Sequence, residues 1–94
     1  MRRTKANDNT VYIGQKEAMT YIMAAMAHFA SGADEVIIKA RGRNISLAVD
    51  VAEMLRNRYL PEVKVKNVQI ATEKLQRDDG KTSKVSSIEI FLNK

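Results

Sequence analysis

The chain has 94 residues, of which 45% are hydrophobic, and its formal net charge at pH 7 is +5. This length suffices for one small domain, since two halves would each bury too little surface to be stable, and we expect residues 1–10 to form a flexible basic tail before a single domain at 11–94. The basic excess favours polyanionic partners, while the lack of cysteine excludes disulfides, thiolate metal sites and thiol nucleophiles.

The sequence contains no segment that is typical of a membrane protein or of a secreted one. The longest mostly apolar stretch, residues 18–30, is interrupted by polar side chains and is shorter than the roughly 20 residues that span a bilayer. The first ten residues are basic but lack the apolar region of a secretory signal. We therefore expect a soluble, cytoplasmic protein that does not contact a membrane.

The first half of the chain alternates between strand and helix patterns. Residues 10–13, with the sequence TVYI, are prone to form a strand. From residue 16 to 31 apolar side chains recur at helical spacing, and Gly32 provides a left-handed helix stop. Residues 35–40 contain three successive β-branched side chains, which predicts an interior strand.

A second helix is predicted from residue 43 to 59 and is ended by Pro61. It carries two apolar stripes, more than one core can cover, so we expect one to pack on the sheet and the other on a partner subunit. The first stripe comprises Ile45, Ala48, Val49, Ala52 and Leu55, and the second comprises Leu47, Val51 and Met54. The interface with the partner is expected at Leu47, Val51, Met54, Leu55, Arg58 and Tyr59. The alternatives are an interaction with the helix C-terminus for Arg58 and a core or cap role for Tyr59.

Two strand-like runs follow, at residues 63–76 and 82–92, and the Asp-Gly within residues 77–81 is typical of a hairpin. The apolar side chains of both runs share one face only if the loop has an odd number of residues. A three-residue loop is the simplest solution, and it predicts Ile70 opposite Ile90 and Leu75 opposite Val85. Residues 72–87 have few large apolar side chains, so this stretch should project as an arm. The expected fold is a two-layer α+β domain of order β-α-β-α-β-β with an extended hairpin arm.

These segments resemble the Alba family of archaeal chromatin proteins. The resemblance extends from Val11 to Leu92, and the segments that carry it are VYIG at 11–14, EVIIKARGRNIS at 35–46, AVDVAEMLRNRYLP at 48–61 and VSSIEI at 85–90. It implies a fold similar to the C-terminal domain of bacterial translation initiation factor three. It further implies a homodimer that binds double-stranded DNA and RNA without sequence preference and compacts the chromosome. Pairing with a paralogue instead of a second copy stays open.

The turn into the second helix has the residue types of a phosphate-binding site. Lys39, Arg41 and Arg43 alternate across it, and Gly42 permits close approach of the backbone to a phosphate. Arg43 and Asn44 lie at the helix start, where unpaired N–H groups and the helix dipole favour an anion. The alternative is a solvated basic turn, and the resemblance to the Alba family favours phosphate binding.

Two further segments join this predicted nucleic-acid surface. Gln15 and Lys16 repeat the same pattern at the entry to the first helix. The family usually has two lysines here, so Gln15 removes one cation and a lysine whose acetylation tunes DNA affinity in some members. The mixed charges of the arm are also compatible with a solvated hairpin, but the resemblance favours contacts toward the minor groove. The basic residues expected to make them are Lys74, Arg77, Lys81 and Lys84.

Enzymatic and metal-dependent functions are disfavoured. One histidine, no cysteine and scattered acidic residues predict no metal site, no cofactor and no small-molecule substrate. The low aromatic content, 5%, argues against recognition of single strands by base stacking, and Tyr12 and Tyr21 are expected to be structural. The main hypothesis is therefore a dimeric, chromosome-associated protein that binds duplex backbones. The alternative is an RNA-binding protein that acts in a ribonucleoprotein or stabilises RNA.

Overall fold

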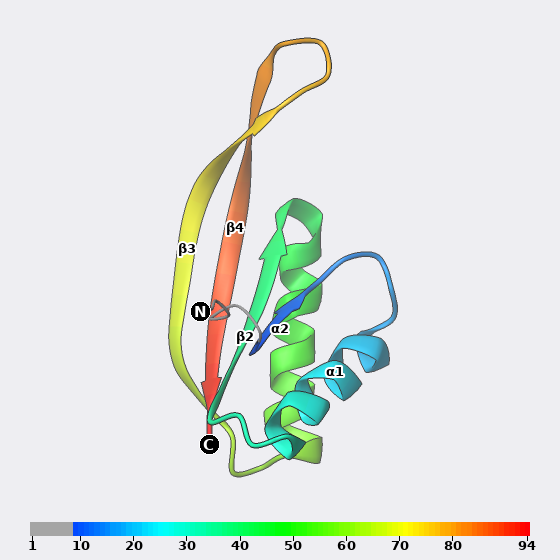
Figure 1. The fold of residues 1–94 in the computed structure, drawn as a ribbon, viewed down its shortest axis with the longest axis vertical. Coiled ribbons are helices and arrows are strands. Elements are labelled where there is room, and N and C mark those ends of the chain that lie inside the picture. The colour runs from blue at the N-terminus through cyan, green and yellow to red at the C-terminus, as the bar shows by residue number, and fades with distance from the viewer. Residues whose placement is uncertain (1–8) are drawn as a thin grey trace, which may run out of the picture.

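The computed structural model describes residues 9–94, so nearly all of the predicted basic tail lies outside the described residues. The chain forms a two-layer α+β fold and confirms the predicted order of strands and helices (Figure 1). Its elements are β1 (Thr10–Tyr12), α1 (Ala18–Ala30), β2 (Glu35–Arg41), the 3-10 turn η2 (Gly42–Asn44), α2 (Ile45–Met54), the π-helical turn η3 (Leu55–Tyr59), β3 (Lys64–Gln76) and β4 (Thr82–Asn93). None of the helices in this described part is long and apolar enough to cross a membrane.

The four strands form one sheet in the order β1-β2-β4-β3. Strand β1 runs parallel to β2, while β4 is antiparallel to both of its neighbours, so β2 is an interior strand as predicted. Helix α1 packs on β1 and β2, and helix α2 packs on β2 and β4, whereas β3 packs mainly against β4 (Figure 1). The core therefore lies between the helices and three of the strands. We call the opposite side of the sheet the outer face.

Helix α1 begins at Ala18, two residues later than predicted, because the preceding loop has another hydrogen-bonding arrangement. The hydroxyl oxygen of Tyr21 accepts hydrogen bonds from the backbone N–H groups of Gly14 and Lys16, both at 2.9 Å. The other end of the helix agrees with the prediction. Gly32 has a left-handed φ of 103°, and the N–H of Ala33 donates to the carbonyl of His28, which closes the helix cap.

The burial of α2 corrects the expected division of its apolar side chains. Val51 and Leu55 are completely buried in the core of the same chain, so neither contributes to a contact surface for a partner. Val49 belongs to the first stripe, but unlike Ala48 and Ala52 of the same stripe it is 41% exposed. Leu47 and Met54 are partly buried against the same core. Arg58 and Tyr59 are exposed, and the hydroxyl of Tyr59 contacts the sulfur of Met19 at 3.4 Å.

The hairpin register differs from the predicted one by two residues, because the turn is centred on Asp79 instead of Gly80. Gln76 pairs with Thr82, which leaves five residues between the two strands. The N–H of Arg77 donates to the carbonyl of Lys81 at 2.7 Å, and Gly80 adopts a left-handed φ of 83°. Ile70 is consequently opposite Ile88, and Leu75 is opposite Ser83. The odd loop length is retained, so the predicted sharing of one face by the apolar residues of both strands is confirmed.

Beyond the sheet, the hairpin continues as the predicted arm. Pairing of β2 with β4 ends at Arg41 and Ser87, so residues 72–86 form a ribbon of two strands that projects from the domain (Figure 1). At the other end of β3, a bulge between Val65 and Asn67 brings Val65 to the same face as Val68. This arrangement leaves an uncovered apolar face beside α2, formed by Val49, Val65, Val68 and Ile70.

Candidate nucleic-acid interface

The two basic loops and the arm meet at one end of the sheet. Because β1 and β2 are parallel, their carboxyl ends and the loops that follow them lie at the same edge. The side-chain amide of Asn44 joins these loops by donating to the carbonyl of Ile13 at 3.4 Å. The arm leaves the sheet at the same end, where Arg41 pairs with Ser87. We call this region the arm end of the sheet.

In the loop before α1, two backbone N–H groups bind a side chain of the same chain. The N–H groups of Gly14 and Lys16 are already occupied by the hydroxyl of Tyr21, which is a buried side chain. A Cβ at position 14 would lie only 3.3 Å from this hydroxyl, so the loop is held tightly around it. These two N–H groups are therefore not available to an anion, while the side chains of Gln15 and Lys16 are exposed.

Gly42 is required by the turn itself and by the arm that packs on it. Its φ is +56°, a conformation that is unfavourable for residues with a side chain. A Cβ at this position would lie 3.2 Å from a methyl group of Val85, at the base of the arm. A methyl group of Val85 thus fills the space on the Cβ side of Gly42, while the residue itself remains partly exposed. The neighbouring Arg43 is exposed.

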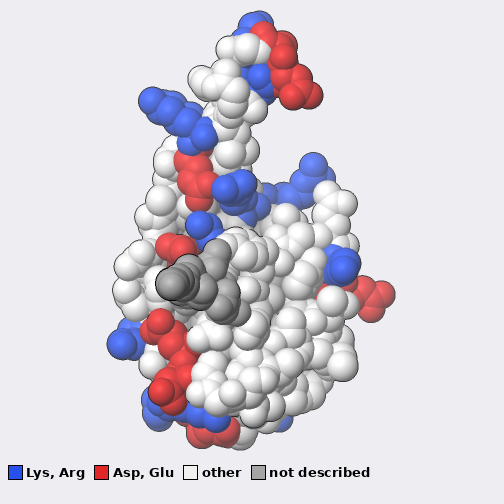
Figure 2. All heavy atoms as spheres, in the orientation of Figure 1, with Lys and Arg blue, Asp and Glu red and all other residues white. Residues whose placement is uncertain are grey.

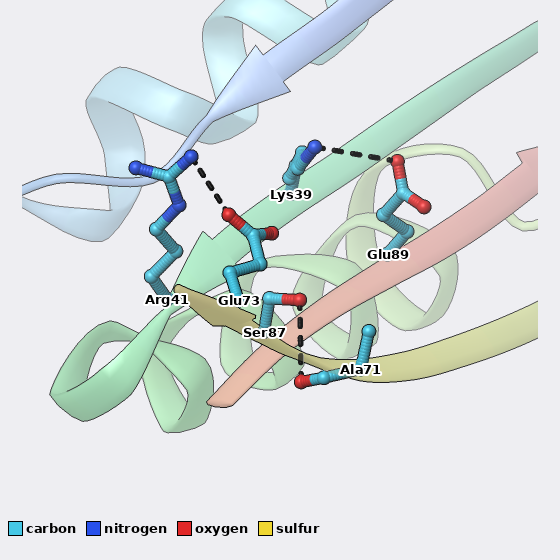
Figure 3. A network of polar contacts seen from close by, with 6 residues as sticks. All are labelled: Lys39, Arg41, Ala71, Glu73, Ser87 and Glu89. Carbon is cyan, nitrogen blue, oxygen red and sulfur yellow. Dashed lines mark hydrogen bonds and ion pairs between the residues drawn. The ribbon is translucent and has the colours of Figure 1, made fainter. Parts of the chain in front are cut away.

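Lys39 and Arg41 lie on the outer face, where each is paired with a glutamate. The guanidinium of Arg41 is 2.8 Å from a carboxylate oxygen of Glu73, and the ammonium of Lys39 is 3.8 Å from that of Glu89 (Figure 3). The first pair connects the end of β2 to the base of the arm. These two cations therefore differ from Lys16 and Arg43, which precede the helices and form no ion pair within residues 9–94.

The arm brings two lysines together. Lys74 and Lys84 are cross-strand partners on the face that continues the helix-covered side of the sheet. Directly opposed like charges destabilise a strand pair, and neither lysine has an acidic partner among the described residues. At the tip, Arg77 is 3.6 Å from Asp79. Figure 2 accordingly shows a basic group part way up the arm and both signs of charge at its tip.

The strongest electrostatic pair of α2 lies away from this interface. Glu53 accepts hydrogen bonds from Arg56 at 2.6 and 3.0 Å. The guanidinium lowers the pKa of Glu53 and the carboxylate raises the pKa of Arg56. Glu53 lines a groove with Val49, Val65 and Val68, so the pair borders the uncovered apolar face. In residues 9–94 no group of three or more histidine and acidic side chains is placed to hold a metal ion.

Tyr12 is the residue that the sequence reasoning missed. It was expected to be structural, but its side chain is 61% exposed, unlike that of Tyr21. Tyr12 pairs with Lys39 across the parallel strands, and the alternation that buries Val11 turns Tyr12 to the outer face. The available signal was the alternation of side chains along a strand, which places Val11 and Ile13 on one face and Tyr12 on the other. So short a strand does not reveal which of its faces is covered.

Comparisons with known proteins agree on one family. A sequence model of the Alba family matches residues 9–72. The DNA/RNA-binding protein Alba 1 of Archaeoglobus fulgidus is 53% identical over 87 residues, which cover 93% of this chain and 97% of that protein. The DNA/RNA-binding protein Alba of Methanocella arvoryzae is 51% identical over 87 residues, with coverages of 93% and 91%. The solved structure of Alba from Thermoplasma volcanium has a TM-score of 0.85 and 44% identity, covering 92% of this chain and 100% of that one. These names describe binding proteins and no enzyme.

Proposed function

Because this chain belongs to the Alba family, we propose that it binds DNA and RNA duplexes through their phosphate backbones, without preference for base sequence, and that it compacts the chromosome. The observation that carries this proposal is the set of cations at the arm end of the sheet and along the arm that lack acidic partners within residues 9–94. They are Lys16, Arg43, Lys74, Lys81 and Lys84. The names of the relatives, which give both DNA and RNA, support the same ligands.

The placement of these cations suits a backbone ligand. Lys16 and Arg43 precede the two helices at the arm end, and Lys74 and Lys84 project from the side of the arm that continues the helix-covered face. A phosphate between the two lysines would relieve their mutual repulsion. Phosphate contacts position a protein on a duplex but carry no base information, so binding is expected to be general. Gln15 and Asn44 would contribute hydrogen bonds at the same edge, and Arg77 would contribute at the tip of the arm.

The acting unit in this proposal is a homodimer, formed when a second copy covers the uncovered apolar face. No helix covers Val65, Val68 and Ile70, and the outer edge of β3 pairs with no strand in the described chain. Contiguous exposed apolar surface of this kind is typical of an interaction site, and a two-fold axis lets the same patch serve both copies. Two copies have a formal net charge of +10, twice the +5 of one chain, and they present two arms.

The salt dependence of binding tests the backbone mechanism. Each neutralised phosphate contributes about −0.9 to the slope of log affinity against log salt for duplex DNA. With six to ten phosphates neutralised by the dimer, we expect a slope of about −5 to −9. The measurement is a titration of a duplex with the purified protein at several salt concentrations. A slope close to zero would exclude this mechanism.

A charge-matched pair of double variants tests the arm. Lys74→Gln with Lys84→Gln removes the two opposed lysines, and Lys64→Gln with Lys66→Gln removes the same charge at the far end of β3. We expect the arm variant to weaken binding equally on unrelated sequences and to reduce the slope by up to about 3.6. The control should reduce the affinity and the slope much less. Equal effects of both variants, or a loss confined to one sequence, would contradict the proposal. Competition between duplex DNA and duplex RNA identifies the preferred ligand.

A further inference from the structure

The outer face of the sheet carries a row of side chains that the proposed function does not use as a unit. Strand register places Tyr12, Lys39, Glu89 and Gln69 side by side, one from each of the four strands. Neighbouring strands are separated by about 4.8 Å, so the row is roughly 14 Å long. It offers an aromatic ring, a cation, a carboxylate and an amide in that order.

Tyr12 stands at the open end of this row. It is 61% exposed, whereas the preceding Val11 and the following Ile13 are buried in the core. It lines a hollow of about 330 Å³ together with Lys39, Arg41 and Asn44. An exposed ring beside two cations and a hollow of this size is the combination with which proteins hold a nucleotide. In four-stranded RNA-recognition modules, aromatic side chains on the open sheet face stack bases in the same manner.

The two cations beside the ring are not equally available. Arg41 is held by Glu73 at 2.8 Å, within hydrogen-bonding distance. Lys39 is 3.8 Å from Glu89, which is too long for a hydrogen bond, so its ammonium group is not hydrogen-bonded to that carboxylate, although its side chain is less exposed than that of Arg41, 29% against 52% (Figure 3). Glu89 and Gln69 provide an acceptor and an amide that suit the 2′-hydroxyl of ribose, which both donates and accepts.

We propose that the outer face binds single-stranded RNA, with one unpaired base stacked on Tyr12 and an adjacent phosphate on Lys39. Bases in a duplex are already stacked and paired, so the ring has no partner there. This site lies on the opposite face of the sheet from Lys74 and Lys84, and it adjoins the duplex surface at Asn44, which lines the hollow beside Tyr12. The inference therefore goes beyond the proposed function and does not depend on it.

Two substitutions of one residue test the stacking contact. Tyr12→Leu removes the aromatic ring and keeps an apolar side chain, whereas Tyr12→Phe keeps the ring and removes only the hydroxyl. The probes are an unstructured RNA of about ten nucleotides and a duplex DNA, each followed by fluorescence anisotropy. Loss of one base–aromatic stack corresponds to a roughly 5- to 150-fold weaker affinity. We expect this loss for Tyr12→Leu on the single strand only, with Tyr12→Phe within about twofold of the unmodified protein.

Several results would overturn the inference. One is an unmodified protein that binds the duplex but not the single-stranded RNA, which would leave the proposed function intact. Others are a Tyr12→Leu variant that loses the same factor on both ligands, or a Tyr12→Phe variant that is as weak as Tyr12→Leu. A single-stranded DNA of the same sequence that binds as tightly would exclude the ribose contact and the choice of RNA.

A second measurement separates stacking from an effect on folding. Because Tyr12 is largely exposed, we expect both variants to melt within a few degrees of the unmodified protein by circular dichroism. Photo-crosslinking of the same RNA carrying 4-thiouridine, followed by mass spectrometry, should identify Tyr12 on the crosslinked peptide. A crosslink confined to the arm would contradict the assignment. So would a Tyr12→Leu variant that is unfolded at the assay temperature together with a Tyr12→Phe variant that binds no RNA.

Discussion

Replacing Ile70 tests whether the uncovered apolar face is the dimer interface. Ile70 is 80% exposed in the single chain, more than any other large apolar side chain in the described part. Full burial of such a side chain is worth about 1.5–3 kcal/mol, so covering the exposed part contributes roughly 1–2.5 kcal/mol per copy. A symmetric interface contains the residue twice. We expect Ile70→Gln to weaken dimerisation by about 2–5 kcal/mol, a factor of at least about 30 in the dissociation constant.

The assay is sedimentation equilibrium over a range of protein concentrations, with Met23→Gln as the matched control. Met23 is 62% exposed on α1, away from the apolar face beside α2 and β3, and the substitution makes the same neutral change. The control should remain as dimeric as the unmodified chain. Because Ile70 is exposed, the unfolding free energy of the single chain should change by less than about 0.5 kcal/mol. The dissociated chain presents half of the cations, so the salt slope of duplex binding should fall by about half. A fully dimeric Ile70→Gln variant, or equal dissociation of both variants, would refute the reasoning.

Two further substitutions test how the arm end is held. Tyr21→Phe removes the hydroxyl that accepts hydrogen bonds from the N–H groups of Gly14 and Lys16. We expect the unfolding free energy, measured in urea, to fall by about 1–3 kcal/mol. An unchanged urea midpoint would show that water replaces the hydroxyl. Gly42→Ala places a methyl group against Val85 at a φ of +56°, which should destabilise by about 1–2 kcal/mol and speed amide hydrogen exchange at the base of the arm. Gly32→Ala is the control, because Gly32 also has a positive φ but has open space around it. It should leave amide hydrogen exchange in the arm unchanged. Equal exchange in the arm of both variants would contradict the packing of Val85 on Gly42.

The local features of this chain followed from the sequence. Helical spacing of apolar residues, a glycine after residue 31 and the Asp-Gly of the hairpin loop act over a few neighbouring residues. These features predicted the element order. The successive β-branched residues at 36–38 predicted the interior position of β2, and the few large apolar residues at 72–87 predicted the projecting arm; the structure confirms all three. The segments that resemble the Alba family are likewise a property of the sequence, and the family comparison agrees with them.

Tertiary structure alone decided which surfaces these elements present. Val49 and Val51 have the same side chain, so only the position of the sheet determines that Val51 is buried and Val49 is exposed. Arg41 and Glu73 are distant in sequence, and their ion pair exists because β2 ends at the base of the arm. Tyr12 faces outward because both helices cover the other side of the sheet. Local patterns arise from the geometry of one segment, whereas burial and charge pairing depend on residues that meet only after folding.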